Sequence, residues 1–114
     1  MIKRFVILRK KSNMSTEEFW RYWENVHGPL IAKIPGLVKY VQYHVTSERL
    51  DTVDDPIDGI AELWFESEQM QKEAYQSPEY QAVVEDEPNL FEMNSHSIHP
   101  VMSKKMVTVV KNSD

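Results

Sequence analysis

The sequence predicts an α+β protein of the ferredoxin-like class, with a four-stranded antiparallel sheet and helices on one face. Strand-like and helix-like segments alternate in the order strand, helix, strand, strand, helix, strand, which is the βαββαβ arrangement of this class. Two clear helix starts and several β-branched runs support the assignment. With 114 residues, the chain is long enough for one hydrophobic core and too short for two. We therefore expect residues 1–114 to form a single domain.

The first strand and the first helix are the most clearly marked elements. Ile2 to Lys10 has apolar residues on both parities and then becomes basic, as a buried strand does at its end. Ser15 and Glu18 have the spacing of a capping box, with Ser15 as the N-cap. Pro29 lacks an amide hydrogen and disfavours helical geometry in the residue before it. We therefore expect this helix to end at Gly28.

Turn and cap residues define the remaining elements. A short helical turn is expected from Pro29 to Gly36. Ser67 caps the second helix, and Ser77 restarts it as a short helix to about Asp86. The other expected strands are Leu37 to Ser47, Ile57 to Glu66 and Met106 to Val110.

Three further stretches carry weaker signals. Glu48 to Pro56 is acidic with little apolar content, which predicts a mobile loop between two strands. The run Glu85-Asp86-Glu87 is expected to be a solvated helix end. Phe91 to Pro100 shows no clear periodicity.

Composition narrows the range of functions. The net charge of -5 argues against binding to a nucleic-acid backbone, which needs a basic face. No apolar run approaches the length that crosses a bilayer, and the N-terminus lacks the pattern of a secretory signal. The absence of cysteine excludes disulfides, thiolate catalysis and cysteine-bound metals, and it fits a cytoplasmic protein.

The strands carry more apolar groups than one covered face requires. Phe5 to Leu8 and Leu63 to Phe65 offer large apolar side chains to both sides of the sheet. A two-layer fold leaves one sheet face without helices, so this face needs another cover. The simplest cover is a second copy of the chain, and we therefore expect a homodimer.

A histidine at the end of the first helix is the leading candidate for chemistry. At 100° per residue, His27 lies about 20° from Trp20 and about 40° from Trp23 around the helix axis. Its location in the last turn favours the imidazolium form, whereas burial against tryptophan favours the neutral ring. The apolar stripe beside it consists of Phe19, Trp23, Val26 and Leu30.

A row of polar side chains on the second strand could complete a site. The even positions Tyr40, Gln42 and His44 share one face, and buried polar groups of this kind need partners. If this face meets the first helix, His27 and His44 would lie across one cavity holding water or a polar ligand. Tyr40 and Gln42 would then orient the ligand. The apolar walls would be Trp20, Trp23 and Trp64.

Each of these features also has a structural interpretation. A histidine beside aromatic residues can be a hydrogen-bonded core residue, and the two indoles of the helix can simply be core. The polar row can be a hydrogen-bonded subunit interface. His96 and His99 point to opposite faces of an extended chain and lack carboxylates at ligand spacing, so we expect no metal site.

The order of several motifs resembles one known family. Phe19-Trp20-Arg21-Tyr22-Trp23 precedes Val26-His27-Gly28-Pro29-Leu30, and Pro35-Gly36-Leu37 leads into Tyr40-Val41-Gln42-Tyr43-His44. Ala61-Glu62-Leu63-Trp64-Phe65-Glu66-Ser67 and Ser77-Pro78-Glu79-Tyr80 follow. This pattern resembles the EthD family of the dimeric α+β barrel superfamily, as far as about Asn89.

The resemblance implies a homodimer of ferredoxin-like subunits whose sheets close into a barrel. Members of the family are associated with the breakdown of ethers and aromatic compounds. Relatives include methylmuconolactone isomerases and polyketide decarboxylases, and related barrels include cofactor-free monooxygenases. The helix histidine of the family maps onto His27, and its strand histidine maps onto His44.

These observations lead to a cofactor-free acid/base enzyme as the main hypothesis. It would isomerise, dehydrate or decarboxylate a small cyclic or aromatic substrate, with His27 as general acid/base and His44 as a second proton carrier. Tyr40 and Gln42 would bind the substrate through hydrogen bonds. The alternatives are a non-catalytic dimer that binds a ligand and a cofactor-free monooxygenase.

Overall fold

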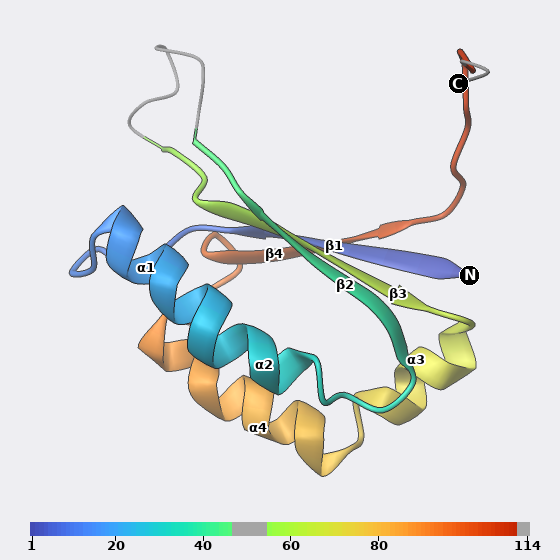
Figure 1. Ribbon diagram of the computed structural model, residues 1–114, viewed down its shortest axis with the longest axis horizontal. Coiled ribbons are helices and arrows are strands. Elements are labelled where there is room, and N and C mark those ends of the chain that lie inside the picture. Colours follow the sequence, from blue (N-terminus) through green and yellow to red (C-terminus); the bar gives the residue numbers. More distant parts are fainter. Residues whose placement is uncertain (47–54, 112–114) are drawn as a thin grey trace.

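One antiparallel sheet carries all the helices on a single face (Figure 1). The structure, a computed structural model, describes residues 1–46 and 55–111. Its strands are β1 (Ile2–Leu8), β2 (Leu37–His44), β3 (Gly59–Phe65) and β4 (Ile98–Ser103). They lie in the order β2-β3-β1-β4, and every neighbouring pair is antiparallel. This confirms the predicted ferredoxin-like α+β class.

The helices begin where the sequence places their caps. They are α1 (Thr16–Tyr22), η1 (Trp23–His27), α2 (Gly28–Ile31), α3 (Glu68–Ala74), α4 (Pro78–Asp86) and η3 (Glu87–Asn89). The capping box is complete, because the Ser15 hydroxyl accepts from the amide of Glu18 and the Glu18 carboxylate accepts from the amide of Ser15. Ser67 and Ser77 cap α3 and α4 through their hydroxyls alone, which accept from the amides of Met70 and Tyr80.

The expected end of the first helix at Gly28 is wrong. Gly28 has helical dihedral angles, φ -55° and ψ -49°, and its amide donates to the carbonyl of Trp23, five residues earlier. Residues Trp23–His27 therefore form one π-helical turn, and the helix continues as α2. Pro29 causes no break because it lies at the start of α2, where a helix needs no amide hydrogen. Single π-helical turns inside α-helices often occur at functional sites.

The wide turn also changes which side chains face the core. Extra residues in the turn rotate the following positions around the helix axis. Val26, expected on the apolar stripe, is 45% exposed, whereas His27 is only 3% exposed. The histidine therefore lies inside the core rather than at its border.

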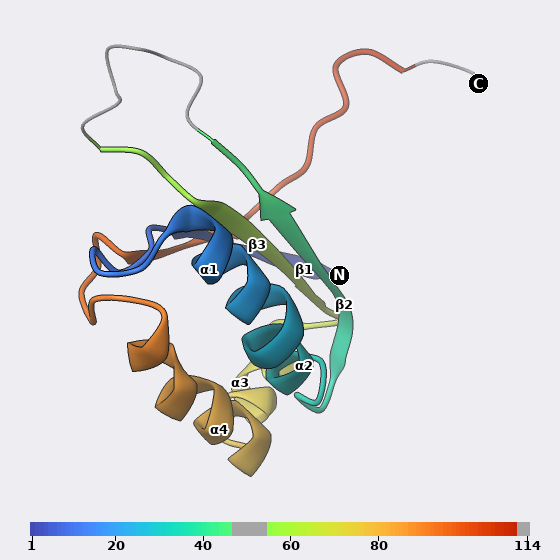
Figure 2. The same cartoon turned by 60° about the vertical axis from the view of Figure 1, so that its left-hand side comes forward.

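The last strand also differs from expectation. β4 (Ile98–Ser103) pairs with β1, whereas the predicted strand Met106 to Val110 lies outside the sheet. The apolar residues of that segment are at least 64% exposed, and the chain there runs away from the sheet (Figures 1 and 2). Met106 to Val110 was predicted from its strand propensity, but the edge strand is the segment that pairs with β1, which is Ile98–Ser103. An edge strand also tolerates Pro100, which lacks an amide hydrogen.

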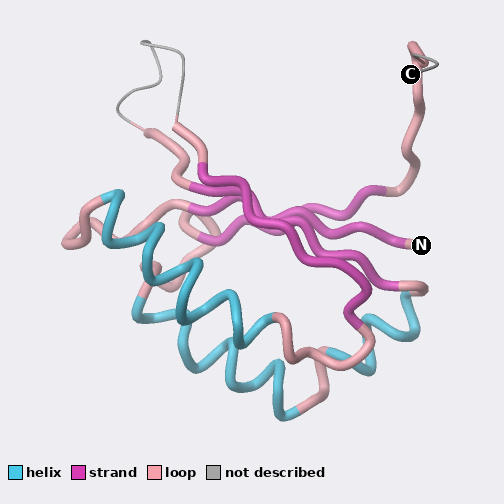
Figure 3. The backbone as a smooth tube through the Cα atoms, in the orientation of Figure 1, coloured by secondary structure: helices cyan, strands magenta, loops and turns pink. Residues whose placement is uncertain are grey.

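The two faces of the sheet have different surroundings, as Figure 3 shows from the helices on one side of the strands. Val6, Ala61 and Leu63 point to the helices and are buried. The core on that face also includes Leu8, Phe19, Trp23, Ile31, Ile34, Phe65, Ala74, Val83, Leu90 and Phe91. We call the opposite side of the sheet the outer face. One row across it, Val101, Phe5, Glu62 and Val41, is paired strand to strand.

The remaining expectations about the chain concern loops and membranes. Residues 48–54 of the loop expected over Glu48 to Pro56 lie outside the described residues. Within the described ranges, every helix is too short or too polar to cross a membrane.

We expect Gly28→Ala to destabilise the protein by about 1 to 3 kcal/mol. An added Cβ would lie 2.8 Å from Nε2 of Gln42 and 2.9 Å from the carbonyl oxygen of Trp23. In an ordinary helix the same change stabilises, because alanine has the higher helix propensity. Urea unfolding followed by circular dichroism measures the effect. Glu24→Ala, at an exposed position of the same helix, should change the free energy of unfolding by less than about 0.5 kcal/mol. A stabilised Gly28→Ala variant would contradict the close packing of this turn.

Candidate functional site

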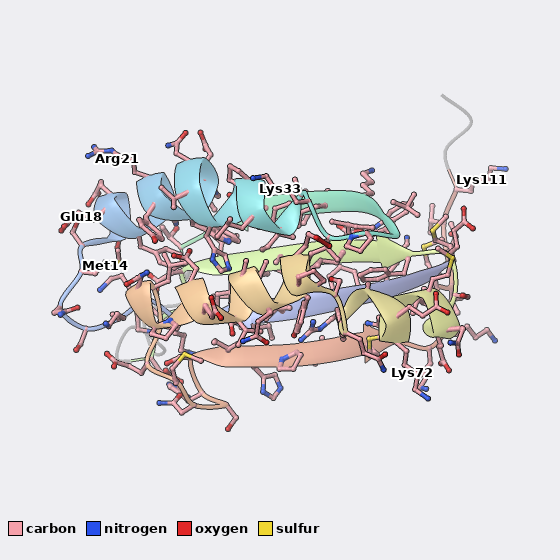
Figure 4. All side chains as sticks on the ribbon, turned by 90° about the horizontal axis from the view of Figure 1, so that it is seen from below. Met14, Glu18, Arg21, Lys33, Lys72 and Lys111 are labelled. Carbon is pink, nitrogen blue, oxygen red and sulfur yellow. The ribbon has the colours of Figure 1, made fainter. Side chains whose placement is uncertain are left out.

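The π-helical turn brings His27 to the last residue of α4. Nδ1 of His27 lies 2.8 Å from Oδ2 of Asp86, and both side chains are largely removed from solvent. The two helices that carry them pack side by side under the sheet, as Figure 1 shows for α2 and α4. Figure 4 shows the same helices across the sheet, with the exposed side chains of Glu18 and Arg21 pointing outward. The histidine therefore faces inward on a layer whose outer side is charged.

Three hydrogen bonds keep Asp86 ionised. Burial alone would raise the pKa of its carboxyl group, but bonds from Tyr22, Asn89 and His27 outweigh that effect and lower the pKa. The Tyr22 hydroxyl and the Asn89 amide both donate to Oδ1, and His27 contacts Oδ2. An ionised carboxylate can only accept hydrogen bonds. Nδ1 of His27 therefore carries the proton, which leaves a lone pair on Nε2.

Burial also decides the charge of His27. Removal from solvent lowers the pKa of the imidazole, and the hydrogen bond and charge of Asp86 oppose this effect without reversing it. The helix end that the sequence predicted to favour the imidazolium does not apply, because the helix continues as α2, and burial outweighs Asp86. The ring of Phe91 packs against the imidazole edge to face, with 6.3 Å between centroids. At neutral pH the ring is therefore neutral and can act as a base.

His27 lines a small cavity between the sheet and the helices. Its volume is about 60 Å³, less than half of the roughly 150 Å³ that holds benzene in an engineered apolar cavity. The polar groups at the cavity come from His27, Arg4, Tyr80 and Glu87. Its other walls are Val6, Leu8, Trp23, Ile31, Ile34, Ala61, Leu63, Val83, Phe91 and Ile98. The cavity admits a small polar group, and a whole ring would require side chains at its rim to move.

A larger depression of about 790 Å³ lies beside the end of β1. Two of the ionisable groups that line it are already paired, because Asp55 bridges Arg9 and His96 at 3.0 and 2.8 Å. Asp58 accepts from the backbone amide of Lys10 at 2.9 Å. The smaller cavity is the better candidate site, since it is lined by the buried His27 and by the partly buried Arg4 and Glu87.

Two charged residues on opposite elements face the cavity beside His27. Burial raises the pKa of the Glu87 carboxyl group, and the guanidinium of Arg4 opposes the rise. Arg4 is held in place by Tyr75, whose hydroxyl accepts from its guanidinium and whose ring lies 5.0 Å away. The expectation that Glu85-Asp86-Glu87 is a solvated helix end is therefore wrong for its last two residues. Only Glu85 of the three is exposed.

The polar row of β2 does face the first helix, but it binds the helix rather than the cavity. Nε2 of Gln42 donates to the carbonyl of Trp23 and to the hydroxyl of Tyr40, both at 2.9 Å. Burial raises the pKa of Tyr40 to about 12, against hydrogen bonds from Gln42 and Trp23 that lower it. Tyr40 and Gln42 therefore hold the carbonyl at the start of the wide turn. Neither residue lines the cavity of His27.

The structure does not bring His27 and His44 into one cavity. The ring of His44 stacks on Trp23 with 4.9 Å between centroids and on Trp20 with 5.6 Å. Its Nε2 lies 2.9 Å from Oε1 of Gln42. His44 is exposed and does not line the cavity, whereas Trp23 lines the cavity and also stacks on His44. The predicted pair is thus separated because the large indole of Trp23 fills the space expected to be hollow.

The three tryptophans have different positions. Trp23 lines the cavity as expected. Trp20 does not, and its indole nitrogen donates to the carbonyl of Asp58 at 2.9 Å. Trp64 lies on the outer face, where the amino groups of Lys3 and Lys39 stand 4.2 and 4.7 Å from its ring. Trp64 is therefore no wall of the site, because its parity on β3 is opposite to that of the buried Leu63.

Sequence reasoning missed Asp86 and Glu87, although a signal for them exists. On a helix, residues three and four positions after an apolar core residue share its face. Val83 is such a residue, and Asp86 and Glu87 follow it at these spacings. Their inward orientation was thus readable once Val83 was recognised as core. Arg4 could be placed in the same way, because it shares the parity of the buried Val6 on β1.

Solved structures share this fold at low sequence identity. An ethyl tert-butyl ether D (EthD) family protein from Bacillus halodurans is 17% identical, with a TM-score of 0.74 over 93% of this chain and 99% of that one. A dimeric ferredoxin-like protein from Bacteroides fragilis is 16% identical, with a TM-score of 0.64 over 90% and 93%. A hydroxynitrile lyase from Passiflora edulis is 14% identical, with a TM-score of 0.64 over 94% and 96%. These likenesses show the fold.

The family follows from the sequence match. No curated protein matches the chain significantly. A family model described as the EthD domain matches residues 11–94, which include the first helix, β2, β3 and α4. The matched region thus holds both members of the His27 and Asp86 pair. Because it spans well over half of the sequence, this chain belongs to the EthD family.

Proposed function

We propose that this chain is a cofactor-free acid/base enzyme of the isomerase, dehydratase or decarboxylase type. Its substrate would be a small cyclic or aromatic compound. The observation that carries the proposal is the buried pair of His27 and Asp86 beside a cavity. A neutral imidazole whose other nitrogen is fixed by a carboxylate is an oriented general base.

The geometry supports a defined sequence of proton movements. Nε2 of His27 takes a proton from the substrate in the cavity, which makes the ring an imidazolium. The ionised Asp86, 2.8 Å from Nδ1, stabilises the positive charge as it forms. Tyr22 and Asn89 hold the carboxylate in place during the step. A positioned base of this kind contributes about 10² to 10⁴ in rate.

The remaining predicted site residues act through the helix. Trp23 forms a wall of the cavity, and His44 supports its ring by stacking. Tyr40 and Gln42 position the turn that carries His27 through the Trp23 carbonyl. We therefore assign proton transfer to His27 and a positioning role to His44. A substrate ring would enter partly, with its reacting group in the small cavity.

We also propose that two copies of the chain, each a single domain over residues 1–114, associate through their outer faces. Tyr43 and Val101 are 44% and 41% exposed there, and Val101 lies beside the half-buried Phe5. Exposed apolar residues grouped on one face favour an interface. The related fold from Bacteroides fragilis is described as dimeric. The cysteine-free composition supports a cytoplasmic location.

His27→Gln should reduce turnover by at least about 100-fold, because glutamine cannot take up the proton. A panel of lactones, phenolic acids and hydroxynitriles, monitored for product and for oxygen consumption, provides the assay. His96→Gln, an exposed histidine paired with Asp55, is the matched control and should keep full turnover. Circular dichroism verifies that both variants fold. Unchanged turnover in His27→Gln would contradict the proposal, and binding without turnover in the wild type would favour a ligand-binding dimer.

The pH dependence should report the lowered pKa of His27. Since the folded ring has a pKa below its ordinary value of about 6.5, the low-pH limb of kcat/KM should lie below pH 6.5. The ring's contribution to stability is present above that value and is lost as pH falls through the folded pKa. Asp86→Asn removes the charge that raises the pKa, so the limb should move to lower pH while the rate falls. Nitrogen-15 NMR of the imidazole checks both effects, and a limb above pH 6.5 would contradict them.

Val101→Asp should weaken the dimer, because it places a charge on the outer face, on the edge strand β4. Val26→Asp is the matched control, since Val26 is 45% exposed but lies on the first helix. Light scattering after size-exclusion chromatography measures the mass of each variant. Only the Val101 variant should shift toward the monomer. Equal masses for both variants would place the interface elsewhere.

A further inference from the structure

The cavity of His27 contains a second group able to carry a proton. Glu87, the first residue of η3, lines the same cavity. Its carbonyl accepts from the amides of Leu90 and Phe91 at 2.9 and 3.0 Å, which fixes the backbone of this turn. Its carboxyl group has no hydrogen-bond partner among the described residues. The backbone of Glu87 is therefore fixed beside the cavity, and its carboxyl group is available to a ligand.

Burial, rather than the neighbouring charges, raises the pKa of the Glu87 carboxyl group. Burial raises its pKa, and Arg4 from β1 opposes the rise. His27 from η1 is neutral at neutral pH, and Tyr80 from α4 adds no charge. Asp86 is adjacent in sequence, is ionised and binds Tyr22, Asn89 and His27. Burial outweighs the charge of Arg4, so the pKa of Glu87 is raised and Glu87 is a better proton donor than an exposed carboxyl group.

Each proton carrier at the cavity has a partner for the charge it acquires. When His27 gains a proton, Asp86 lies 2.8 Å from its Nδ1. When Glu87 loses a proton, the guanidinium of Arg4 faces the same cavity. Tyr75 holds that guanidinium by a hydrogen bond and by its ring. Two groups with opposite tasks and matching counter-charges are the arrangement expected of an acid and base pair.

We infer that Glu87 is the general acid that works with His27 on one substrate in this cavity. The inference rests on the proposed function and deepens it. The substrate class it specifies is a small carbonyl compound with a hydroxyl group on the second carbon from the carbonyl. The reaction is an elimination of water, which requires both a base and an acid.

The step balances without a cofactor. Nε2 of His27 takes the proton from the carbon next to the carbonyl group, and the electron pair of that C–H bond forms the new C=C bond. The bond between the neighbouring carbon and the hydroxyl oxygen breaks with its electron pair on oxygen. Glu87 donates its proton to that oxygen, and water leaves. Proton exchange with solvent then returns His27 to the neutral form and Glu87 to the acid form.

Glu87→Gln tests the assignment, because glutamine keeps the size of the side chain and cannot donate this proton. With a substrate from the panel extended by β-hydroxy carbonyl compounds, kcat should fall about 10² to 10⁴-fold. The fall in kcat/KM on the alkaline side should disappear, while the low-pH limb of His27 remains. Glu85→Gln, an exposed glutamate two residues earlier, is the control and should keep both limbs.

A second measurement does not depend on turnover. Carbon-13 NMR should show the carboxyl group of Glu87 titrating above the ordinary glutamate value of about 4.3 in the wild-type protein. Arg4→Gln should raise the Glu87 midpoint further, because it removes the opposing charge. A Glu87 midpoint at or below the ordinary value, or a Glu87→Gln variant with normal rate and both limbs, would overturn the inference. If His27→Gln loses turnover and Glu87→Gln does not, the inference about Glu87 is wrong and the proposed function is retained. If His27→Gln keeps normal turnover, the proposed function itself is wrong.

Discussion

The hydrogen bond between His27 and Asp86 is the interaction on which the site depends. It joins the end of the π-helical turn to the last residue of α4, so it links two helices that are distant in sequence. Burying an unpaired carboxylate would cost several kcal/mol, because water no longer solvates its charge. Here Tyr22, Asn89 and His27 replace that water. The same bond that offsets the cost of burial also fixes the imidazole as a base, so stability and chemistry rest on one contact.

Two hydrogen bonds to one carbonyl oxygen hold the turn that positions this bond. Gly28 donates to the carbonyl of Trp23, and Gln42 donates to the same oxygen from β2. Any side chain at position 28 would collide with both partners, which leaves glycine as the residue that fits. Pro29 then begins α2 without a broken hydrogen bond. A wide turn would be costly in an isolated helix, and here packing against β2 stabilises it.

Local signals in the sequence predicted the fold well and the site only in part. The caps at Ser15, Ser67 and Ser77 are local interactions, so the residues concerned can be read directly. The last strand depends on which segment pairs with β1, and strand propensity alone chose the wrong one. The predicted fold class is still correct, because Ile98–Ser103 takes the edge position that was expected for Met106 to Val110.

The structure brings some of the predicted site residues together and separates others. His27 and Trp23 line one cavity because both lie on one helix face, whereas the positions of His44 and Trp64 depended on how helix and sheet pack. The bulky ring of Trp23 occupies the space between helix and sheet, and strand parity places Trp64 on the outer face. Asp86 was missed because a run of three acidic residues usually indicates solvent. The core position of Val83 contradicts that interpretation for two of the three.

The separation of the two faces of the sheet explains how the proposed site and the proposed interface can share one sheet. Arg4 and Phe5 are neighbours in β1, yet Arg4 faces the cavity and Phe5 lies on the outer face. Successive side chains of a strand point to opposite faces of the sheet, so one strand can contribute both to the proposed site and to the proposed interface. A charge placed on the outer face need not disturb the cavity. Conversely, a shift of register by one residue would exchange the two roles at once. The register of β1 with β3, in which Val6 faces Ala61, is therefore the constraint that keeps Arg4 beside Glu87.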